Sequence, residues 1–346
     1  MKDPIVIAPN LKKRLSGVTA TIARLVPLQA HKIAIKATGP GLPVNTPHIS
    51  LTRLALLARR PQRVWHARRN LEMLLGIGLK IVLRKNWKLM FTSASQRKHS
   101  EYTKWLISKM DTVVATSAKG ATYLTVPATV VHHGIDPAQF CPADKDIVRS
   151  RLGLPNGRLI GCFGRVRHQK GTDIFVDAML ANVANHPDII GVILGRATKD
   201  HTSFEQNLKR KISKAGLSNR IRFCGEVTVD AIPEWYQALD LFIAPQRWEG
   251  FGLTPLESMA CGVPVIATRV GAFEELIVDE KTGRLIPCDD ITAMSNALND
   301  ALSNPATLTR WSTAARAHVA LHFTLEKEAD ALIGIYEALL RDDQVI

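Results

Sequence analysis

The sequence lacks the cysteine pairs, long apolar runs and signal peptide that would indicate a disulfide-rich, membrane-spanning or secreted protein. It has five cysteines in 346 residues, an odd number without any CxxC pair. This pattern argues against a disulfide framework or a zinc site and fits a reducing compartment. The longest apolar stretch, Met73–Leu83, is interrupted by Lys80 and is shorter than the roughly 20 residues that a membrane helix needs. The apolar run Ile5–Ala8 is too short for a signal peptide, so we expect a cytoplasmic protein, or one on the inner face of a membrane.

Acidic residues are scarce in the first half of the chain. Residues 1–150 contain 24 Lys and Arg but 7 Asp and Glu, a balance of +17, whereas residues 151–346 contain 21 and 24, a balance of −3. This asymmetry indicates that the first half faces nucleic acid, a membrane surface or an acidic substrate. Aromatic residues are not interleaved with the basic clusters and no nucleic-acid-binding module is recognisable, so we expect no nucleic-acid partner. The clusters are Lys12–Arg14, Arg59–Arg69, Arg84–Lys88 and Arg97–Lys104.

Short apolar runs alternate with helical patterns, and the 46% apolar content allows a sizeable core. The length suggests two domains. Strands alternating with helices predict an α/β fold with parallel, doubly wound sheets. The expected strands are 4–9, 32–36, 63–66, 88–92, 112–116 and 129–132, followed by 159–163, 189–194, 221–223, 241–244, 263–267 and 284–286. Three helices, near 290–302, 306–320 and 325–341, complete the chain.

Two stretches of the first half allow two interpretations each. The helix expected at 71–83 is apolar on most sides and bounded by basic residues. It is either a core helix with solvated ends or a helix at a membrane interface, with its cations toward anionic headgroups. The basic loop Asn10–Gly17, between a strand and a helix, is either a ligand loop or an ordinary turn.

The stretch Arg247–Glu257, RWEGFGLTPLE, has the clearest chemical pattern. Pro255 suits the first turn of a helix, because its missing N–H would have no partner there. The sequence therefore places Glu249 on a loop and Glu257 on the first turn of a helix.

The same stretch offers groups that bind anions and hydroxyls. The N–H groups of Gly252–Thr254 are expected to point outward from a helix start, which attracts phosphate. Gly250 and Gly252 let a ligand approach the backbone closely. With a carboxylate on each side, the pattern favours a ligand that has a phosphate between two sugars. A plain strand–loop–helix connection with two surface glutamates would have the same pattern.

A second loop of the later half is basic and bounded by glycines. Arg165 and Lys170 lie between Gly164 and Gly171, directly after an expected strand. Ligands of doubly wound sheets bind beyond the carboxyl ends of the strands, where Gly195 also lies. Arg165 and Lys170 can converge there on a diphosphate, although a solvated basic loop has the same composition.

These motifs occur in a recognisable order: Gly164-Arg165 with Lys170-Gly171, then Glu249-Gly250-Phe251-Gly252 with Glu257, then Ala260–Ala267. The order resembles that of the family 4 retaining glycosyltransferases, which have the GT-B fold. The match covers the second half, and the first half matches more loosely through Ser16–Val18 and the hinge His133–Phe140. The resemblance implies two Rossmann-like domains facing a cleft. It implies an acceptor-binding domain at 1–140, a nucleotide-sugar-binding domain at 141–322, and a C-terminal helix at 323–346 that packs back on the first domain.

The resemblance also implies roles for single residues. Arg165 and Lys170 match the pair that neutralises the donor diphosphate, Glu249 matches the carboxylate that holds the transferred sugar, and Glu257 matches the one that binds the ribose. We expect Glu249, Arg165 and Lys170 to be catalytic. The whole implied donor site is Gly164, Arg165, Lys170, Gly195, Glu249, Gly250, Phe251, Gly252, Leu253, Thr254 and Glu257. The family uses no divalent metal here, and no acidic pair in the chain has metal-ligand spacing, so we expect no metal and no cofactor.

The chain departs from the family pattern at two positions. Family members usually carry a histidine just after the strand expected at 88–92, where this chain has Ser93 and Ala94. The family's hinge asparagine is replaced by His133. The candidates on the acceptor side are Ser16, Gly17, His66 and His99.

The sequence as a whole resembles lipopolysaccharide core mannosyltransferases of alphaproteobacteria. This implies transfer of mannose from GDP-mannose to the inner Kdo of a lipid A precursor, which is an anionic lipid-linked acceptor, by a protein peripheral to the anionic inner face of the inner membrane. Another glycosyltransferase of cell-envelope polysaccharide is the nearest alternative. A GT-B nucleotide-sugar epimerase would be soluble and would need no basic domain. A nucleic-acid-binding protein is suggested by charge alone and leaves the Glu249–Glu257 array unexplained.

Overall fold

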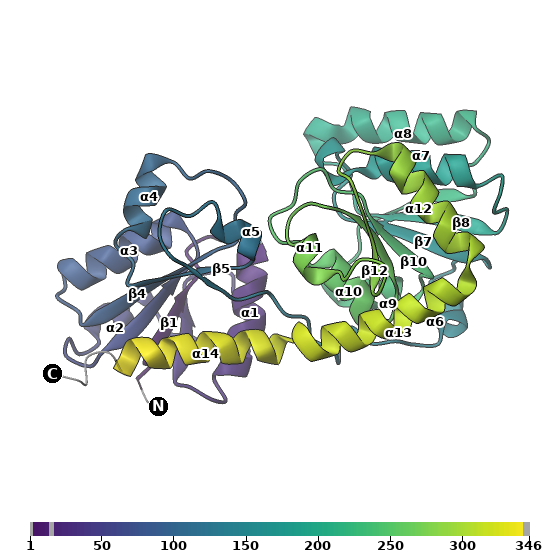
Figure 1. Ribbon diagram of the computed structural model, residues 1–346. Coiled ribbons are helices and arrows are strands. Elements are labelled where there is room, and N and C mark those ends of the chain that lie inside the picture. The colour runs from purple at the N-terminus through teal and green to yellow at the C-terminus, as the bar shows by residue number, and fades with distance from the viewer. Residues whose placement is uncertain (1–2, 14–16, 342–346) are drawn as a thin grey trace. The chain divides into compact units, whose positions relative to one another are not determined.

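The chain folds into two compact α/β units, each built on a six-stranded parallel sheet (Figure 1). The computed structural model describes residues 3–13 and 17–341. One unit contains the chain up to Gly134 together with the segment from Leu325 onward. The other unit is continuous from Ile135 to Thr324. The first unit is therefore built from two pieces of chain that are distant in sequence.

The sheet of the first unit has the strand order β2-β1-β3-β4-β5-β6. Its strands are β1 (Val6–Pro9), β2 (Ile35–Thr38), β3 (Arg63–Ala67), β4 (Trp87–Ser93), β5 (Thr112–Ala115) and β6 (Thr129–Val130). One face packs against α1 (Gly17–Gln29) and α14 (Leu325–Arg341), which contact each other. The opposite face packs against α2 (Leu51–Leu56), α3 (Asn70–Ile81) and α4 (Glu101–Ile107), and the short α5 (Ala118–Ala121) follows β5.

The sheet of the second unit has the strand order β12-β11-β10-β7-β8-β9. Its strands are β7 (Arg158–Phe163), β8 (Ile189–Leu194), β9 (Ile221–Gly225), β10 (Leu241–Ala244), β11 (Val265–Thr268) and β12 (Gly283–Ile286). One apolar core joins the sheet to α7 (Thr172–Asn182), α8 (Thr202–Lys214) and α12 (Ile291–Ser303). The other joins it to α6 (Lys145–Arg151), α9 (Ile232–Gln237), α10 (Thr254–Ala260), α11 (Phe273–Leu276) and α13 (Pro305–His322). Three short 3-10 helices lie in loops: η1 (His168–Lys170), η2 (Lys199–His201) and η3 (Val229–Ala231).

Local sequence explains why these elements form and where they begin. All six residues of β8, Ile-Ile-Gly-Val-Ile-Leu, are buried, as expected for a parallel strand covered on both faces. Ser50, Ser100 and Ser117 cap α2, α4 and α5 by accepting a hydrogen bond from a backbone N–H three residues later. Such a cap satisfies a donor that has no partner inside the helix.

Polar contacts fix α14 to the rest of the first unit. Glu328, which is almost fully buried, accepts hydrogen bonds from the N–H of Gly134 at 2.8 Å and from Nδ1 of His133 at 2.7 Å. The hydroxyl of Tyr336 is hydrogen-bonded to Nδ1 of His66 at 2.7 Å. Lys32 and Asp330 form a surface ion pair. The helix is thus an integral part of the first unit.

The structure confirms the predicted α/β fold with two doubly wound sheets and a C-terminal helix on the first unit. Each expected strand is present, with one clear displacement. We expected a strand at 32–36, whereas β2 begins at Ile35. The N–H groups of Lys32 and Ile33 instead bond to the carbonyl of Gln29, which closes the end of α1 and delays the strand.

Candidate functional site

Three loops of the second unit leave its sheet side by side. They follow β7, β8 and β10, which are neighbours in the order β10-β7-β8, and parallel strands present their carboxyl ends at one edge. Gly164 follows β7 with φ of 134°, and Gly195 follows β8 with φ of 128°. A Cβ on Gly195 would lie 2.0 Å from the carbonyl oxygen of Gly164. The two glycines therefore let the loops approach more closely than any side chain would allow.

The loop from Arg165 to Gly171 is held against the end of β10. Val166 is buried, and its N–H bonds to the carbonyl of Arg196 at 3.1 Å. Gly171 has φ of 71°, and a Cβ there would lie 1.8 Å from the carbonyl oxygen of Pro245. Arg165, directly before the first anchor, is exposed, and Lys170, directly before the second, ends the short helix η1. The basic side chains are thus presented by a tightly fixed backbone.

Arg247 joins this loop to the stretch that follows β10. Its guanidinium donates two hydrogen bonds to the carboxylate of Asp173, both at 2.8 Å, and others to Asp289 and to the carbonyl of His168, both at 2.6 Å. Its own N–H bonds to the carbonyl of Gln169 at 3.0 Å. The hydrogen bonds to Asp173 raise the pKa of Arg247 further, despite partial burial. The forked pairing makes Arg247 a rigid brace between the two loops.

Glu249 lies on the loop, as predicted, and forms an ion pair with Lys170. Its second carboxylate oxygen accepts a hydrogen bond from the N–H of Gly250 at 3.1 Å. Its side chain fills the space above two glycines with positive φ, Gly252 and Gly271, where an added Cβ would lie 2.9 Å from its Cγ and 3.0 Å from its Cβ, respectively. Side chains on either glycine would displace Glu249, so the backbone and the carboxylate fit each other.

The predicted helix start is present. Helix α10 begins at Thr254, with Pro255 in its first turn, and Thr254 Oγ1 is buried without a hydrogen-bond partner in the described residues. Glu257 lies in the first turn and accepts a hydrogen bond from the hydroxyl of the fully buried Tyr236 at 2.9 Å. Burial raises the pKa of Tyr236 well above its usual value, and the carboxylate of Glu257 adds to the effect. Tyr236 therefore stays protonated and holds the orientation of Glu257.

The structure brings several of the predicted donor-site residues together. Lys170 and Glu249 are in direct contact, and Gly250, Phe251, Gly252, Leu253, Thr254 and Glu257 continue along the same segment. Arg165 is exposed on the neighbouring loop. The sequence places Arg247 in this stretch without indicating its role, because its partner Asp173 lies 74 residues earlier and no spacing signals such a pair.

The candidates in the first unit have different surroundings. Ser16 lies outside the described residues, and Gly17 begins α1, where an added Cβ would meet no non-neighbouring described atom within 4 Å. His66 is fully buried on β3, between Tyr336 and Thr92, whose hydroxyl lies 2.6 Å from its Nε2. Burial lowers the pKa of His66 well below 6.5, and Arg68 adds to this. With both nitrogens bonded to its own chain, the ring of His66 offers no surface to a ligand.

His99 differs from His66 in being partly exposed. It lies in the loop between β4 and α4, beside Arg97. Its Nε2 is buried without a hydrogen-bond partner in the described residues. Burial lowers the pKa of His99, and the positive charges of Arg97 and Lys104 act in the same direction.

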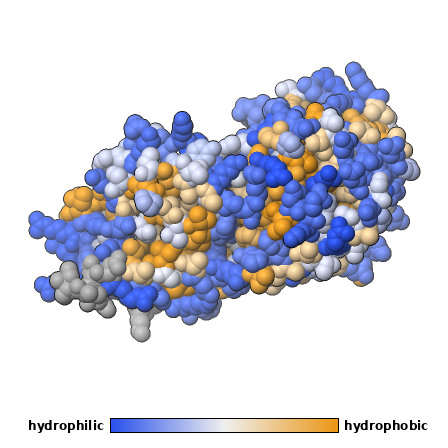
Figure 2. All heavy atoms as spheres, in the orientation of Figure 1, coloured by the Kyte–Doolittle hydropathy of each residue, from blue (hydrophilic) through white to orange (hydrophobic). Residues whose placement is uncertain are grey.

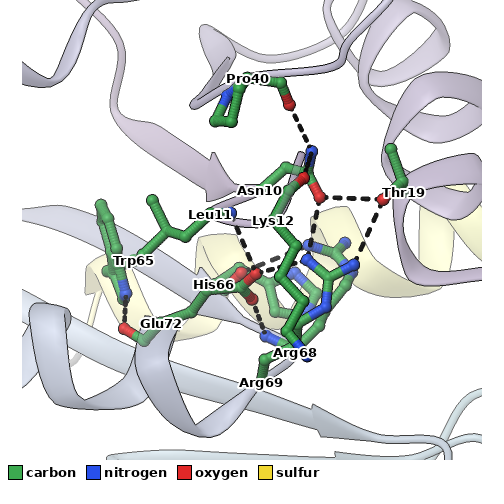
Figure 3. A network of polar contacts seen from close by, with 10 residues as sticks. All are labelled: Asn10, Leu11, Lys12, Thr19, Pro40, Trp65, His66, Arg68, Arg69 and Glu72. Atoms are coloured by element: carbon green, nitrogen blue, oxygen red, sulfur yellow. Dashed lines mark hydrogen bonds and ion pairs between the residues drawn. The ribbon is translucent and has the colours of Figure 1, made fainter. Parts of the chain in front are cut away.

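A buried polar network lies where β1 and β3 end (Figure 3). Asn10 accepts hydrogen bonds from Thr19 at 3.0 Å and from Arg69 at 2.9 Å, and it donates to the carbonyl of Pro40 at 2.7 Å. Arg69 also pairs with the fully buried Glu72 at 2.8 Å. Because Glu72 accepts from the N–H of Leu11 at 3.4 Å as well, the network ties the first βα loop to the start of α3.

Within residues 3–13 and 17–341, no cluster of three or more His, Cys, Asp or Glu side chains could hold a metal ion. No helix in those ranges is long and apolar enough to cross a membrane.

Comparison with known proteins identifies relatives of high sequence identity. A family model described as glycosyl transferases group 1 matches residues 144–318. The chain is 51% identical to the lipopolysaccharide core biosynthesis mannosyltransferase LpsB of Rhizobium meliloti (strain 1021) and 47% identical to LpcC of Rhizobium leguminosarum bv. viciae, which carries the same description. Both alignments cover 99% of each chain. Among solved structures, Anabaena HepE in complex with UDP superposes with a TM-score of 0.84 at 18% identity, covering 96% of this chain and 99% of HepE.

Proposed function

This chain belongs to the group 1 glycosyl transferases, and on that premise we propose that it is a retaining mannosyltransferase of lipopolysaccharide core biosynthesis. The observation that carries the proposal is the 51% and 47% identity, over 99% of both chains, to two proteins described as core mannosyltransferases. A shared fold alone would leave the reaction open, because one fold hosts many functions.

We propose that the donor, GDP-mannose, binds at the carboxyl edge of the second sheet. Lys170 and Arg165 neutralise the diphosphate, and the N–H groups of Gly252–Thr254 donate to it. Glu249 accepts hydrogen bonds from hydroxyls of the mannose, and Glu257 accepts them from the ribose. The contact between Lys170 and Glu249 supports this arrangement, because it puts a cation beside the carboxylate at the junction of phosphate and sugar.

These residues contribute to the reaction mainly by electrostatic stabilisation of the leaving group. When the bond between mannose C1 and the phosphate oxygen breaks, negative charge grows on the leaving GDP. Fixed cations and backbone donors that are already oriented toward this charge lower the barrier without reorganising. The tight anchoring of the loop at Val166 and Gly171 provides that fixed orientation. The acceptor oxygen then bonds to C1 on the face that the leaving group occupied, and its proton passes to the departing phosphate oxygen, so the anomeric configuration is retained.

We propose that the acceptor is the inner Kdo of a lipid A precursor, bound by the first unit. That unit contains 24 Lys and Arg against 10 Asp and Glu, a net charge of +14, and such an acceptor carries phosphates and carboxylates. The same charge attracts the protein to the anionic inner face of the inner membrane as a peripheral protein. Gly17 and His99 remain the acceptor-side candidates with accessible surroundings.

An assay of the purified protein tests this function. GDP-mannose, UDP-glucose and UDP-galactose would each be offered with lipid A that carries Kdo and with lipid A that lacks it. We expect transfer only from GDP-mannose and only to the Kdo-bearing acceptor. Transfer from a uridine nucleotide sugar, or equal transfer to both acceptors, would contradict the proposal. In parallel, Lys170→Ala should weaken binding of GDP more than binding of GMP, because its proposed partner is the distal phosphate.

A further inference from the structure

Helix α3 has apolar side chains on two opposite sides. Met73, Gly76 and Ile77 are buried against the sheet. On the other side, Leu71, Leu74 and Ile81 are 52%, 42% and 68% exposed. Spacings of three and seven residues place them on one stripe of the helix. Val82, directly after the helix, extends the stripe and is also exposed.

Helix α4 lies beside α3 and continues this surface. The side chain of Asn70 donates to the hydroxyl of Thr103 at 2.8 Å, which joins the start of α3 to α4. Both helices pack on the same face of the sheet, so their outer sides point the same way. On α4, the rings of Tyr102 and Trp105 stack with centroids 6.3 Å apart, and each side chain is about half exposed.

We call this the α3–α4 surface, and its members are Leu71, Leu74, Ile81, Val82, Tyr102 and Trp105. In Figure 2, apolar side chains reach the surface of the first unit among hydrophilic ones, including the region where Figure 1 draws α3. Monomeric soluble proteins rarely leave apolar side chains contiguous in this way unless they bind something.

The charge around the surface has one sign. Residues 69–111 contain nine Lys and Arg against three Asp and Glu. Each of the three acids is paired with a basic neighbour: Glu72 with Arg69, Glu101 with Lys104, and Asp111 with Lys80. The exposed cations Arg84, Arg97, Lys98 and Lys109 lie in the same region and leave it net positive.

Lys85 does not belong to this set of exposed cations, although its neighbour Arg84 does. Its side chain is buried, and its ammonium donates to the carbonyl of Leu57. Burial lowers the pKa of Lys85, and the charges of Arg63 and Arg59 add to the effect. The basic run Arg84–Lys88 therefore presents fewer charges to solvent than the sequence suggests.

We propose that the α3–α4 surface docks the protein on an anionic lipid bilayer. The leucines, Ile81 and the two aromatic rings enter the boundary between headgroups and acyl chains, and the surrounding cations contact the headgroups. Aromatic residues with one polar end suit that boundary. A second copy of the chain fits the surface less well, because it would bring two positive patches together. The inference rests on the proposed function, which places the acceptor in such a bilayer, and adds which side chains insert.

The first experiment compares two triple variants of the full chain, each of which removes three exposed apolar side chains. The test variant is Leu71→Gln, Leu74→Gln, Ile81→Gln. The matched control is Ile147→Gln, Val229→Gln, Leu321→Gln, whose three positions are 61%, 73% and 62% exposed in the second unit. Sedimentation with vesicles of phosphatidylcholine and phosphatidylglycerol measures binding. We expect the test variant to bind at least about tenfold more weakly, and the control to bind like the wild type.

A second measurement reports insertion directly. Brominated phosphatidylglycerol quenches tryptophan that reaches the acyl region, so wild-type fluorescence should fall on binding. In Trp105→Phe the quenching should be largely lost while binding persists. GDP binding by calorimetry should be unchanged in every variant, since these positions lie outside the donor site.

The outcomes separate this inference from the proposed function. Equal vesicle binding by the test and control variants, or unchanged quenching in Trp105→Phe, would overturn the α3–α4 surface and leave mannosyl transfer to detergent-dispersed acceptor unaffected. Lipid-free self-association of the wild type that the test variant abolishes would identify a second copy as the occupant and also overturn it. Vesicle binding that behaves as expected, without any mannosyl transfer, would instead refute the proposed function.

Discussion

At the scale of single residues, the proposed donor site depends on the contact between Glu249 and Lys170. The carboxylate lies over Gly252 and Gly271, accepts the N–H of Gly250, and meets Lys170 from the neighbouring loop. Its position is fixed by the backbone, so its chemistry can be changed without much change in packing.

We expect Glu249→Gln to lower kcat by at least about a hundredfold while GDP binding changes little. The amide keeps the shape of the side chain but loses the charge that strengthens hydrogen bonds to the sugar in the transition state. Initial-rate kinetics and calorimetry with GDP provide the two measurements. Glu280→Gln, at an exposed glutamate paired with Arg284, is the control and should keep full turnover. Wild-type turnover in Glu249→Gln would remove Glu249 from the catalytic assignment.

The buried histidine predicts a pH dependence of stability. The pKa of His66 is held well below 6.5 by burial, so in the folded chain the ring stays neutral as the pH falls. The unfolded chain takes up a proton near pH 6.5, so the unfolded state then binds more protons. Stability is therefore retained above pH 6.5 and falls below it, by up to about 1.4 kcal/mol per pH unit from this residue.

Urea unfolding measures the effect at several pH values from about 7.5 to about 5, which lie on either side of the unperturbed histidine pKa of roughly 6.5. His66→Gln can still bond to Thr92 and Tyr336 but cannot titrate. We expect the variant to show a shallower loss of stability in acid than the wild type. The remaining slope has contributions of the same sign from His99 and His318, whose pKa values burial also lowers. Identical slopes for both proteins would contradict the role of His66.

The sequence indicated candidate residues for the site, whose roles stay predictions, but it did not indicate their contacts. The motif from Glu249 to Glu257 was recognisable because its glycines, proline and carboxylates are contiguous. The roles of Arg247 and Tyr236 were not, because Asp173 and Glu257, their partners, meet them only after folding. The burial of His66 was also missed, since its second partner, Tyr336, lies 270 residues away on α14.

At the scale of elements, the site depends on two loops whose positions relative to each other are fixed. The loop after β7 carries Lys170 and the loop after β10 carries Glu249, and Arg247 bonds across them to Asp173. The strands themselves were predictable from short apolar runs, because both faces of a parallel sheet are buried. The sequence pattern placed the start of β2 too early, because the residues after Gln29 still bond to the end of α1.

We expect Arg247→Lys and Asp173→Asn each to weaken GDP binding by roughly 10- to 100-fold, the equivalent of one lost charged hydrogen bond. Lysine cannot reproduce the forked pair with Asp173, so the loops lose their common brace. The double variant should be little worse than the poorer single variant, because both changes remove the same interaction. Calorimetry supplies the four affinities. Fully additive losses would show that the two residues act separately, and Arg284→Lys, at a surface pair with Asp300, serves as the control.

At the scale of the whole molecule, the two units have different electrostatic character. The first unit contains 24 Lys and Arg against 10 Asp and Glu, whereas the second unit contains 21 of each kind. This division was visible in the sequence. The placement of the apolar stripe on the outer side of α3 was not, because the helix is apolar on two sides and only the packing shows which one remains exposed.

We expect mannosyl transfer to be unaffected by excess EDTA. The positive field at the proposed diphosphate position comes from Arg165, Lys170 and the backbone N–H groups before α10, all of which are part of the chain. Rates measured before and after dialysis against the chelator provide the test. Loss of activity that Mg²⁺ or Mn²⁺ restores would show that a cation shares this role.

The composition of the first unit from two separate pieces of chain has a consequence for biosynthesis. Ribosomes synthesise the polypeptide from its N-terminus, so residues 135–324 emerge and can complete their own unit before α14 is synthesised. Until then the apolar face of β1 and β3, together with α1, lacks Ala329, Leu332 and Tyr336 from its core. A nascent chain with an uncovered apolar face is prone to aggregation and is the kind of surface that chaperones bind. The second unit can thus finish folding before the first unit, because the first unit is complete only after α14 has been synthesised.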